Sequence, residues 1–415
     1  MGMPTPRKLV PDSIAWAVFL ACSWTWCIGM ILPTLMLRDG GIGGYLIFLI
    51  PNAIGAAAMG WVLRRDDQSF RFVANHELAC RAFSWITILF HVFAIAWLST
   101  MLPLVSLLVA SFVVLAVHIL LWSQGTCLRR AGFIVFLASI CLALIYLVNP
   151  APSRPTWPNG ASMPADFWIL ALVCVFGFAL CPYLDLTFHR VRQSEGPHAS
   201  KVSFTVGFCV FFVMMMVFSF MYSGWLESVV SLPQAEGNPK RFGLIAPTLF
   251  ATHFGLQAWF TIRAHTRELA RTDATPRALT ASHSQTWLVV FAVVVAISLA
   301  AISRYPHGFA DLSFGEVGYR VLLGFYGLVF PAYMLIVALP AGGFGKQATG
   351  SHPLGARMIM FAVAVGGASP FYFFGFVQRD ESLLAPGLAI VIASRVFLPV
   401  MSRIIGQHES ASTSV

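Results

Sequence analysis

Asp185 is the residue best suited to chemistry, because it is a carboxylate in an otherwise apolar run, FGFALCPYLDLTFHR at 176–190. An ionisable side chain inside a membrane-spanning segment is costly and marks a functional site by default. Gly177 and Pro182 precede it, and proline removes a backbone donor and clashes with the preceding turn. We therefore predict a helix break at Gly177 and Pro182, with a second half-helix that starts near Tyr183. The positive N-terminal end of that half-helix would suit Asp185 or an anionic solute group.

The alternative is an unbroken helix. Asp185 would then lie roughly 28 Å along the axis from Asp166, at a rise of 1.5 Å per residue, and close to the inner membrane surface. Its carboxylate would pair with His189 or Arg192 and would have a structural role only.

The first apolar run is disturbed in a similar way. Serine and threonine can bond carbonyls that a helix break frees, and glycine tolerates unwound backbone. Tryptophans in membrane helices are enriched near the helix ends, so two of them in mid-helix need another reason. Either they are buried packing residues, or the helix is broken at Gly29, its free carbonyls bind an ion and its aromatic side chains line a solute pocket. The residues concerned are Ser23, Trp24, Thr25, Trp26, Gly29 and Pro33.

Polar residues also share helix faces in the apolar run at 243–262. Thr248 and Thr252 are four residues apart, as are His253 and Gln257, so each pair lies on one face. The threonines either bond helix carbonyls four residues back or help to bind a cation. His253 is either a packing residue or, because histidine titrates near neutrality, a proton carrier.

Composition identifies the elements that hold these residues. Of the 415 residues, 58% are hydrophobic and 10% are charged, whereas a soluble domain has roughly 25% charged residues. The apolar runs have about the 20 residues that a helix needs to cross a bilayer. We therefore predict an all-α polytopic membrane protein and exclude a soluble enzyme, a nucleic-acid-binding domain, a secreted disulfide scaffold and a β-barrel. The twelve expected spans are 13–37, 42–63, 82–101, 104–122, 131–149, 166–189, 203–225, 243–262, 286–303, 317–340, 356–377 and 382–401.

The distribution of basic residues predicts the orientation. With the N-terminus inside, the cytoplasmic segments hold 18 Lys and Arg residues and the opposite side holds seven, while Arg395 lies in the last span. This bias predicts a plasma (inner) membrane protein with cytoplasmic N- and C-termini. It also accounts for the net charge of +9 without an anionic partner.

The two interrupted runs, the first and the sixth, are five spans apart and cross the membrane in opposite directions. This is the topology of an inverted repeat of five plus five helices, whose midplane site lies between two discontinuous helices. The major facilitator fold is the main competing architecture. The expected divisions are a cytoplasmic N-terminus at 1–12, two five-helix repeats at 13–149 and 150–340, two additional helices at 341–405 and a disordered tail at 406–415.

Two segments resemble core helices of the solute:sodium symporters. SWTWCIGMILPTLMLRDGGIGGY at 23–45 is similar to their first core helix, and 176–201 is similar to their sixth, with His189-Arg190 where that family has Gln-Arg. The resemblance covers about 50 residues. The broader LeuT-type (amino acid–polyamine–organocation) superfamily fits nearly as well, and the extra leading helix common in the symporters is absent. The resemblance implies a LeuT-type fold and cation-coupled transport.

The same resemblance implies a place for the coupling ion. Sodium would be held by backbone carbonyls near Cys22–Thr25 and by hydroxyls of the eighth helix, here Thr248 and Thr252. The adjacent pair of hydroxyls that the family has is missing, so the implied site is incomplete, and coupling to H⁺ through His253 is the alternative.

Together, these observations predict a symporter that moves a small organic solute with Na⁺ or H⁺. We expect no enzymatic activity, no cofactor, no bound metal and no nucleic-acid partner. Membrane lipid is the expected partner besides the solute, and the sequence predicts no particular protein partner. The aromatic residues favour a flat or apolar solute, such as an aromatic amino acid or a nucleobase. One alternative is a membrane-embedded enzyme acting on lipid or acyl groups, with His91, His118 or Asp185 as base; another is a non-transporting sensor on a transporter fold. The expected solute contacts are Ser23, Trp24, Thr25, Cys181, Tyr183, Asp185, His253, Gln257 and Tyr326.

Overall fold

The computed structural model describes residues 12–123, 128–148, 166–230, 243–272, 311–339 and 352–412, and the single residues 294, 298 and 309. Within these ranges the secondary structure is helical, apart from one isolated bridge between Phe309 and Leu312. The first five helices are α1 (Asp12–Val62), α2 (Asp66–Asn75), α3 (Glu77–Ser99), α4 (Leu104–Ser123) and α5 (Leu128–Val148). Next come α6 (Phe167–Leu180), η1 (Cys181–Leu184), α7 (Leu186–Ser194), α8 (Pro197–Val206), η2 (Gly207–Phe212), α9 (Val213–Val230) and α10 (Ile245–Thr272). The last are α12 (Phe314–Gly324), η4 (Phe325–Val329), α13 (Phe330–Tyr333), η5 (Met334–Ala338), α14 (Leu354–Val377), η6 (Glu381–Leu383) and α15 (Leu384–Ser412).

Nine helical segments of the described part are long and apolar enough to cross a membrane. This confirms the prediction of an all-α polytopic membrane protein, whereas the number of twelve spans stays a prediction. The segment Asp12–Val62 counts once although it covers the first two expected spans, and α10 is not among the nine. The expected span at 286–303 lies almost entirely outside the described residues.

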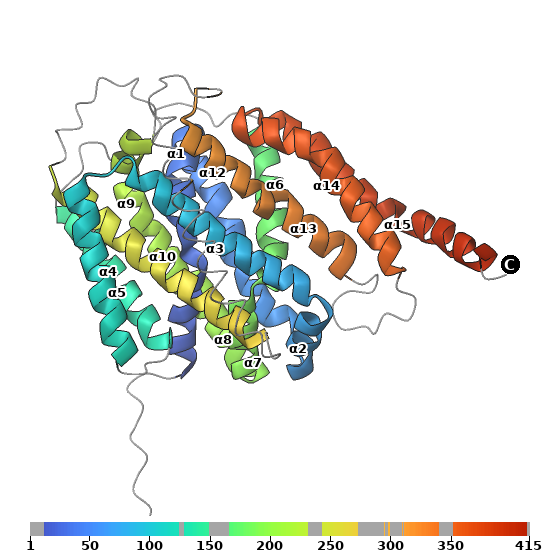
Figure 1. The fold of residues 1–415 in the computed structure, drawn as a ribbon, viewed down its shortest axis with the longest axis horizontal. Helices are drawn as coiled ribbons and strands as arrows, with labels where there is room; N and C mark the ends of the chain where they lie inside the picture. Colours follow the sequence, from blue (N-terminus) through green and yellow to red (C-terminus); the bar gives the residue numbers. More distant parts are fainter. Residues whose placement is uncertain are drawn as a thin grey trace, which may run out of the picture.

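α1 lies at the centre of the bundle and α4 at its periphery. In the most apolar window of each helix, 89% of α1 is buried and only 11% of α4. α1 packs against α5, α6, α8, α9 and α10, while α14 and α15 pack on each other at the opposite edge from α4 and α5 (Figure 1). The outer face of α4 exposes large apolar side chains, including Phe112 at 73% and Leu108 at 60%. Such a face suits contact with lipid acyl chains.

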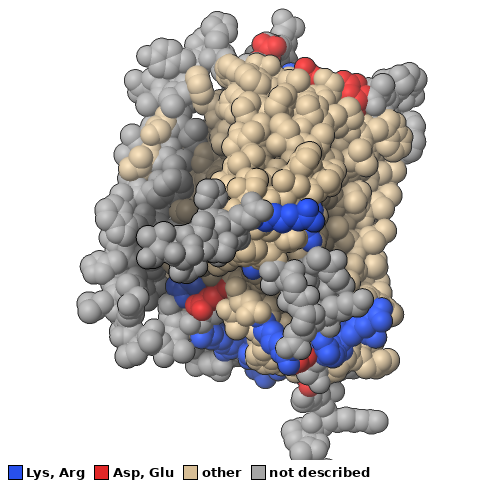
Figure 2. All heavy atoms as spheres, turned by 90° about the vertical axis from the view of Figure 1, so that its right-hand side faces the viewer, with Lys and Arg blue, Asp and Glu red and all other residues tan. Residues whose placement is uncertain are grey.

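Charged side chains gather at the two ends of the molecule. On the face shown in Figure 2, most Lys and Arg lie in the lower half and one group lies near mid-height, whereas acidic residues lie along the upper edge and at a few lower places. The middle of that face is largely uncharged, as expected for a surface at the depth of the hydrocarbon core.

α1 contains two breaks, one of which involves a residue that rarely adopts such a conformation. Gly41 has φ 59° and ψ −153°, and Trp26 has φ 35° and ψ 177°. Positive φ is open to glycine but costs a bulky residue about 1–3 kcal/mol. The first helix is therefore broken, as one of the two sequence interpretations proposed. The break near the predicted position falls at Trp26 rather than at Gly29, and we call it the α1 break.

The strain at Trp26 predicts an inverted order of two substitutions. Trp26→Gly and Trp26→Ala remove the same ring, but only glycine tolerates the positive φ. We expect Trp26→Gly to be more stable than Trp26→Ala by about 1–2 kcal/mol, whereas in a regular helix alanine is better by about 1 kcal/mol. Thermal unfolding of the purified variants measures this difference. Ala21→Gly, in the regular turn before the break, should lower the melting temperature, and a more stable Trp26→Ala would contradict the break.

Candidate functional site

Two side chains support the first residue after the α1 break. The N–H of Cys27 donates to Nε2 of His91 at 3.2 Å, and Nδ1 of the same ring lies 2.8 Å from the carbonyl of Thr87. A carbonyl can only accept, so Nδ1 carries the proton and the imidazole is neutral. The hydroxyl of Tyr319 donates to the carbonyl of Cys27 at 3.3 Å. His91 therefore braces the helix break and is not available as a base.

A glutamine from α10 supports the turn of α1 that precedes the break. Nε2 of Gln257 donates to the carbonyl of Cys22 at 2.5 Å and lies 3.1 Å from Oγ1 of Thr261. The Gln257 side chain is completely buried, and its Oε1 has no hydrogen-bond partner among the described residues. The Gln257 amide thus bonds to one of the carbonyls, that of Cys22, which the sequence resemblance assigned to a cation.

Aromatic rings surround the break. The ring centroid of Trp24 lies 4.5 Å from that of Trp26 and 5.0 Å from Phe188 on α7, and Nε1 of Trp24 donates to Oδ1 of Asn52. Trp26 in turn lies 5.4 Å from Tyr326 on η4. The broken part of α1 is therefore in direct contact with the elements around the second break. The other rings beside Trp26 belong to Phe83 and His265.

The other predicted break lies between α6 and α7, and we call it the second break. α6 ends at Leu180, a 3₁₀ turn with Pro182 near its start follows, and Asp185 leaves helical geometry with φ −79° and ψ 111°. α7 begins at Leu186, three residues later than the expected Tyr183, because the 3₁₀ turn occupies the intervening positions. The unbroken helix of the alternative interpretation is wrong.

Asp185 caps the N-terminus of α7. Its Oδ1 accepts hydrogen bonds from the backbone N–H and the hydroxyl of Thr187, both at 2.7 Å. The side chain is fully buried, and Oδ2 has no hydrogen-bond partner among the described residues. Because buried polar atoms in native proteins are nearly always bonded, Oδ2 is an acceptor that a solute or a proton could satisfy.

The two glycines predicted as break points have a different role. Gly177 lies within α6, where a Cβ would come 2.8 Å from the carbonyl oxygen of Tyr326. A Cβ on Gly29 would come 3.0 Å from the terminal methyl of Met216. Both residues allow close helix contact instead of breaking the backbone.

Most other predicted solute contacts are bonded to the backbone. Ser23 donates to the carbonyl of Leu20 at 3.1 Å, and Thr25 donates to Ala21 at 2.9 Å. The thiol of Cys181 donates to the carbonyl of Tyr326 at 3.3 Å. These three residues lie beside the breaks, but their hydroxyl and thiol groups hold the local backbone.

Tyr183 and His253 complete the predicted set. The carbonyl of Tyr183 accepts a hydrogen bond from Nε2 of His189 at 2.8 Å. Nδ1 of the same histidine is bonded to the hydroxyl of Ser69 on α2. His253 is buried on α10, and its Nε2 has no partner among the described residues. Tyr183 therefore belongs to the second break, whereas His253 makes no described bond to either break.

The three predicted ion ligands do not form a common site. Thr252 donates to the carbonyl of Thr248 at 2.7 Å, and the hydroxyl of Thr248 bonds to Ser106 of α4 at 2.9 Å. The thiol of Cys22 donates to Gly132 of α5 at 3.4 Å. The back-bonding interpretation of Thr252 is thus the one observed, and the hydroxyl of Thr248 is directed away from the α1 break.

The sequence interpretation missed a polar stripe on α10. Gln257, Thr261, His265 and Glu268 follow one another at intervals of four, four and three residues, which places them on one helix face. His265 is fully buried, its Nδ1 bonds to Ser84 at 3.1 Å, and its Nε2 has no described partner. The helical spacing could have revealed this stripe, but the expected span ended at residue 262, whereas α10 continues to Thr272.

A buried ion network, which we call the outer network, joins α1 to α12. The guanidinium of Arg38 lies 2.6 Å from Oε1 of Glu316, which also accepts from Nε of Arg320 at 2.9 Å. Nη2 of Arg320 lies 2.5 Å from Oδ2 of Asp39. Glu316 is only 1% exposed, so the network closes a desolvated contact between the two helices.

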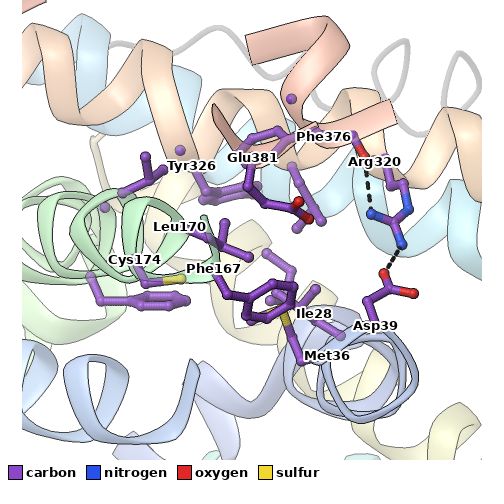
Figure 3. A pocket seen from close by; sticks show the side chains of 17 residues that line it. Ile28, Met36, Asp39, Phe167, Leu170, Cys174, Arg320, Tyr326, Phe376 and Glu381 are labelled. Atoms are coloured by element: carbon purple, nitrogen blue, oxygen red, sulfur yellow. Dashed lines mark hydrogen bonds and ion pairs between the residues drawn. The ribbon is translucent and has the colours of Figure 1, made fainter. Parts of the chain in front are cut away.

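Below this network lies a cavity, the outer pocket, between α1, α6, α12 and α14 (Figure 3). It extends from Asp39 and Arg320 down to Gly177 and Tyr326. Because Tyr326 also packs on Trp26, the lower end of the outer pocket lies next to the α1 break. Its walls are mainly apolar and include Phe167, Leu170, Cys174 and Phe376.

No family model matches the chain. No curated protein matches it either. Among solved structures, the manganese transporter of Eremococcus coleocola in complex with an aromatic bis-isothiourea compound is similar over 97% of both chains, with 15% identity and a TM-score of 0.43. A mutant of the same transporter gives 14% identity and a TM-score of 0.42 over the same share of both chains. These scores are too low to carry an argument about function, which rests on the geometry of the two breaks. Within the residues that the structure describes, no group of three or more His, Cys, Asp or Glu is placed to hold a metal ion.

At the end of the molecule opposite the outer network, His76 connects the start of α3 to α13. Its Nδ1 lies 3.0 Å from the hydroxyl of Tyr333. Burial, with a smaller contribution from Arg357, lowers the pKa of His76 from 6.5 to about 4. The unfolded chain therefore binds a proton between pH 6.5 and pH 4 that the folded protein does not bind, so folding stability falls as the pH is lowered through this window.

The pH effect of His76 can be isolated by substitution. We expect His76→Gln to reduce the loss of thermal stability between pH 6.5 and pH 4. The exposed His198, replaced by glutamine, serves as the control and should leave the profile unchanged. Identical pH profiles for His76→Gln and the original protein would contradict the assigned role.

Proposed function

We propose that the chain is a secondary transporter with a LeuT-type inverted repeat of five plus five helices and two additional C-terminal helices. One observation carries the proposal: the breaks in α1 and between α6 and α7 lie against each other through Trp24 and Phe188. Discontinuous helices at a shared midplane position are the usual place for a transporter's solute and coupling-ion sites. The bias of Lys and Arg between alternate loops of the sequence supports cytoplasmic N- and C-termini.

The proposed solute is a small organic molecule with a flat or apolar part. The rings of Trp24, Trp26, Phe188 and Tyr326 provide aromatic surface beside the breaks. Oδ2 of Asp185 supplies one acceptor for a polar group of the solute, next to this surface. The outer pocket supports an access route from the side of the outer network, because it reaches Tyr326.

For the coupling ion we propose H⁺ rather than Na⁺. The amide of Gln257 already donates to the carbonyl of Cys22, and the hydroxyls of Thr248 and Thr252 are bonded elsewhere. Asp185 and His265, by contrast, each keep a buried titratable atom without a described partner. A proton can occupy either atom without the several oxygen ligands that a sodium ion needs.

The test is solute uptake by the purified protein in proteoliposomes. A panel of aromatic amino acids, nucleobases and aromatic amines is first ranked by thermal stabilisation, since a ligand of the folded state raises its melting temperature. The best solute should then accumulate under an inward proton gradient and not under an inward sodium gradient, and a protonophore should abolish accumulation. Uptake that follows sodium alone would contradict proton coupling. Binding without uptake under either gradient would contradict transport and leave the sensor alternative.

A further inference from the structure

We propose that the outer pocket binds a small organic ammonium ion, with the carboxylate of Glu381 as its counter-ion and the apolar walls around its hydrocarbon part. Figure 3 shows the Glu381 side chain directed into the space beside Leu170, Phe167 and Phe376. The pocket is separate from Asp185, and the proposal holds whether or not its ligand is transported.

The other charges of the outer pocket are mutually compensated. All three nitrogens of the Arg320 guanidinium are used: Nε donates to Glu316, Nη1 to the carbonyl of Phe376 at 2.9 Å, and Nη2 to Asp39. Asp39 is also held by Arg38 at 2.8 Å. An entering anion would therefore have to displace existing bonds of Arg320, which disfavours an anionic ligand.

Glu381 is the exception among these charges. Its residue is only 9% exposed, and its carboxylate forms no ion pair with any Lys or Arg that the structure describes. The backbone N–H of Glu381 and the guanidinium of Arg320 favour its negative charge, whereas Asp39 and Asp166 disfavour it. A buried carboxylate without a paired cation is costly, and an ammonium ion that donates to it would remove that cost.

The size and walls of the outer pocket restrict the ligand. The volume of the outer pocket, measured as the space open to the centre of a water-sized sphere, is about 80 Å³. One ordered water needs roughly 10–15 Å³ measured in the same way. The pocket therefore suits a ligand of about five to eight non-hydrogen atoms. The aromatic and aliphatic walls favour a compact hydrocarbon group, as in cyclohexylammonium.

The experiment compares two ligands of the same shape and different charge. Cyclohexylammonium and cyclohexanol are titrated against the full-length protein in detergent, with the melting temperature as the readout. We expect a saturable rise with cyclohexylammonium and none with cyclohexanol over the same concentrations. Glu381→Gln should lower the affinity for cyclohexylammonium by roughly tenfold to a hundredfold, the usual effect of losing a charge-assisted hydrogen bond.

Two further variants keep the test decisive. Asp380→Asn removes the neighbouring carboxylate, which does not line the outer pocket, and should leave ammonium binding unchanged. Leu170→Trp fills the cavity and should abolish binding while Glu381 is intact, so the proposal is testable even if Glu381→Gln folds poorly. Equal stabilisation by cyclohexanol, equal losses in Glu381→Gln and Asp380→Asn, or no saturable effect of cyclohexylammonium would each overturn the proposal.

Discussion

Asp185→Asn is expected to abolish proton-driven solute uptake while leaving the folded protein about as stable as the original. Asparagine keeps the oxygen that accepts from Thr187 and is as good an N-cap as aspartate. It replaces Oδ2, the buried atom without a described partner, with an amide that neither carries a negative charge nor binds a proton. The expected loss is therefore in uptake and not in folding, and a proteoliposome assay beside a thermal unfolding curve separates the two.

Two further variants test this separation. Asp185→Ala removes the cap as well as the charge, so it should lose uptake and also about 1 kcal/mol of stability. Asp166→Asn, at the start of α6, removes a carboxylate away from both breaks and should retain uptake. Normal uptake by Asp185→Asn would show that neither solute binding nor proton coupling needs the carboxylate of Asp185.

The sequence predicts the two breaks because the residues that disturb each helix are local. Pro182 cannot continue an α-helix, and Asp185 is a favourable N-cap for the next one. At the first break the sequence indicates only the region, because the strained residue is Trp26 and not the nearby Gly29. Tertiary contacts determine that choice, since His91 and Gln257 bond to the backbone on either side of Trp26.

Contacts between distant segments account for the remaining errors. Nothing in the pattern around Thr248 shows that its hydroxyl would bond to Ser106 of another helix. The roles of Gly29 and Gly177 also depend on partners far along the chain, Met216 and Tyr326. By contrast, the stripe from Gln257 to Glu268 was readable from its helical period and was missed because the end of the helix was placed too early.

Glu316→Gln, a substitution in the outer network, is expected to cause the largest loss of stability among the single substitutions considered for this chain. Glu316→Gln removes the carboxylate between Arg38 and Arg320, which are only 15% and 11% exposed in their side chains. An uncharged amide cannot balance two buried guanidinium groups, and removing one member of a buried ion network costs about 3–5 kcal/mol. The measurement is the melting temperature in detergent.

Glu381→Gln is the matched comparison at the same end of the molecule. Because Glu381 has no ion pair with a described Lys or Arg, the loss of its carboxylate should change stability far less. The double variant Glu316→Gln, Arg38→Gln should recover part of the loss, since it removes one of the two cations that would otherwise share the single carboxylate of Asp39. If Glu316→Gln were as stable as Glu381→Gln, the outer network would not hold α1 to α12.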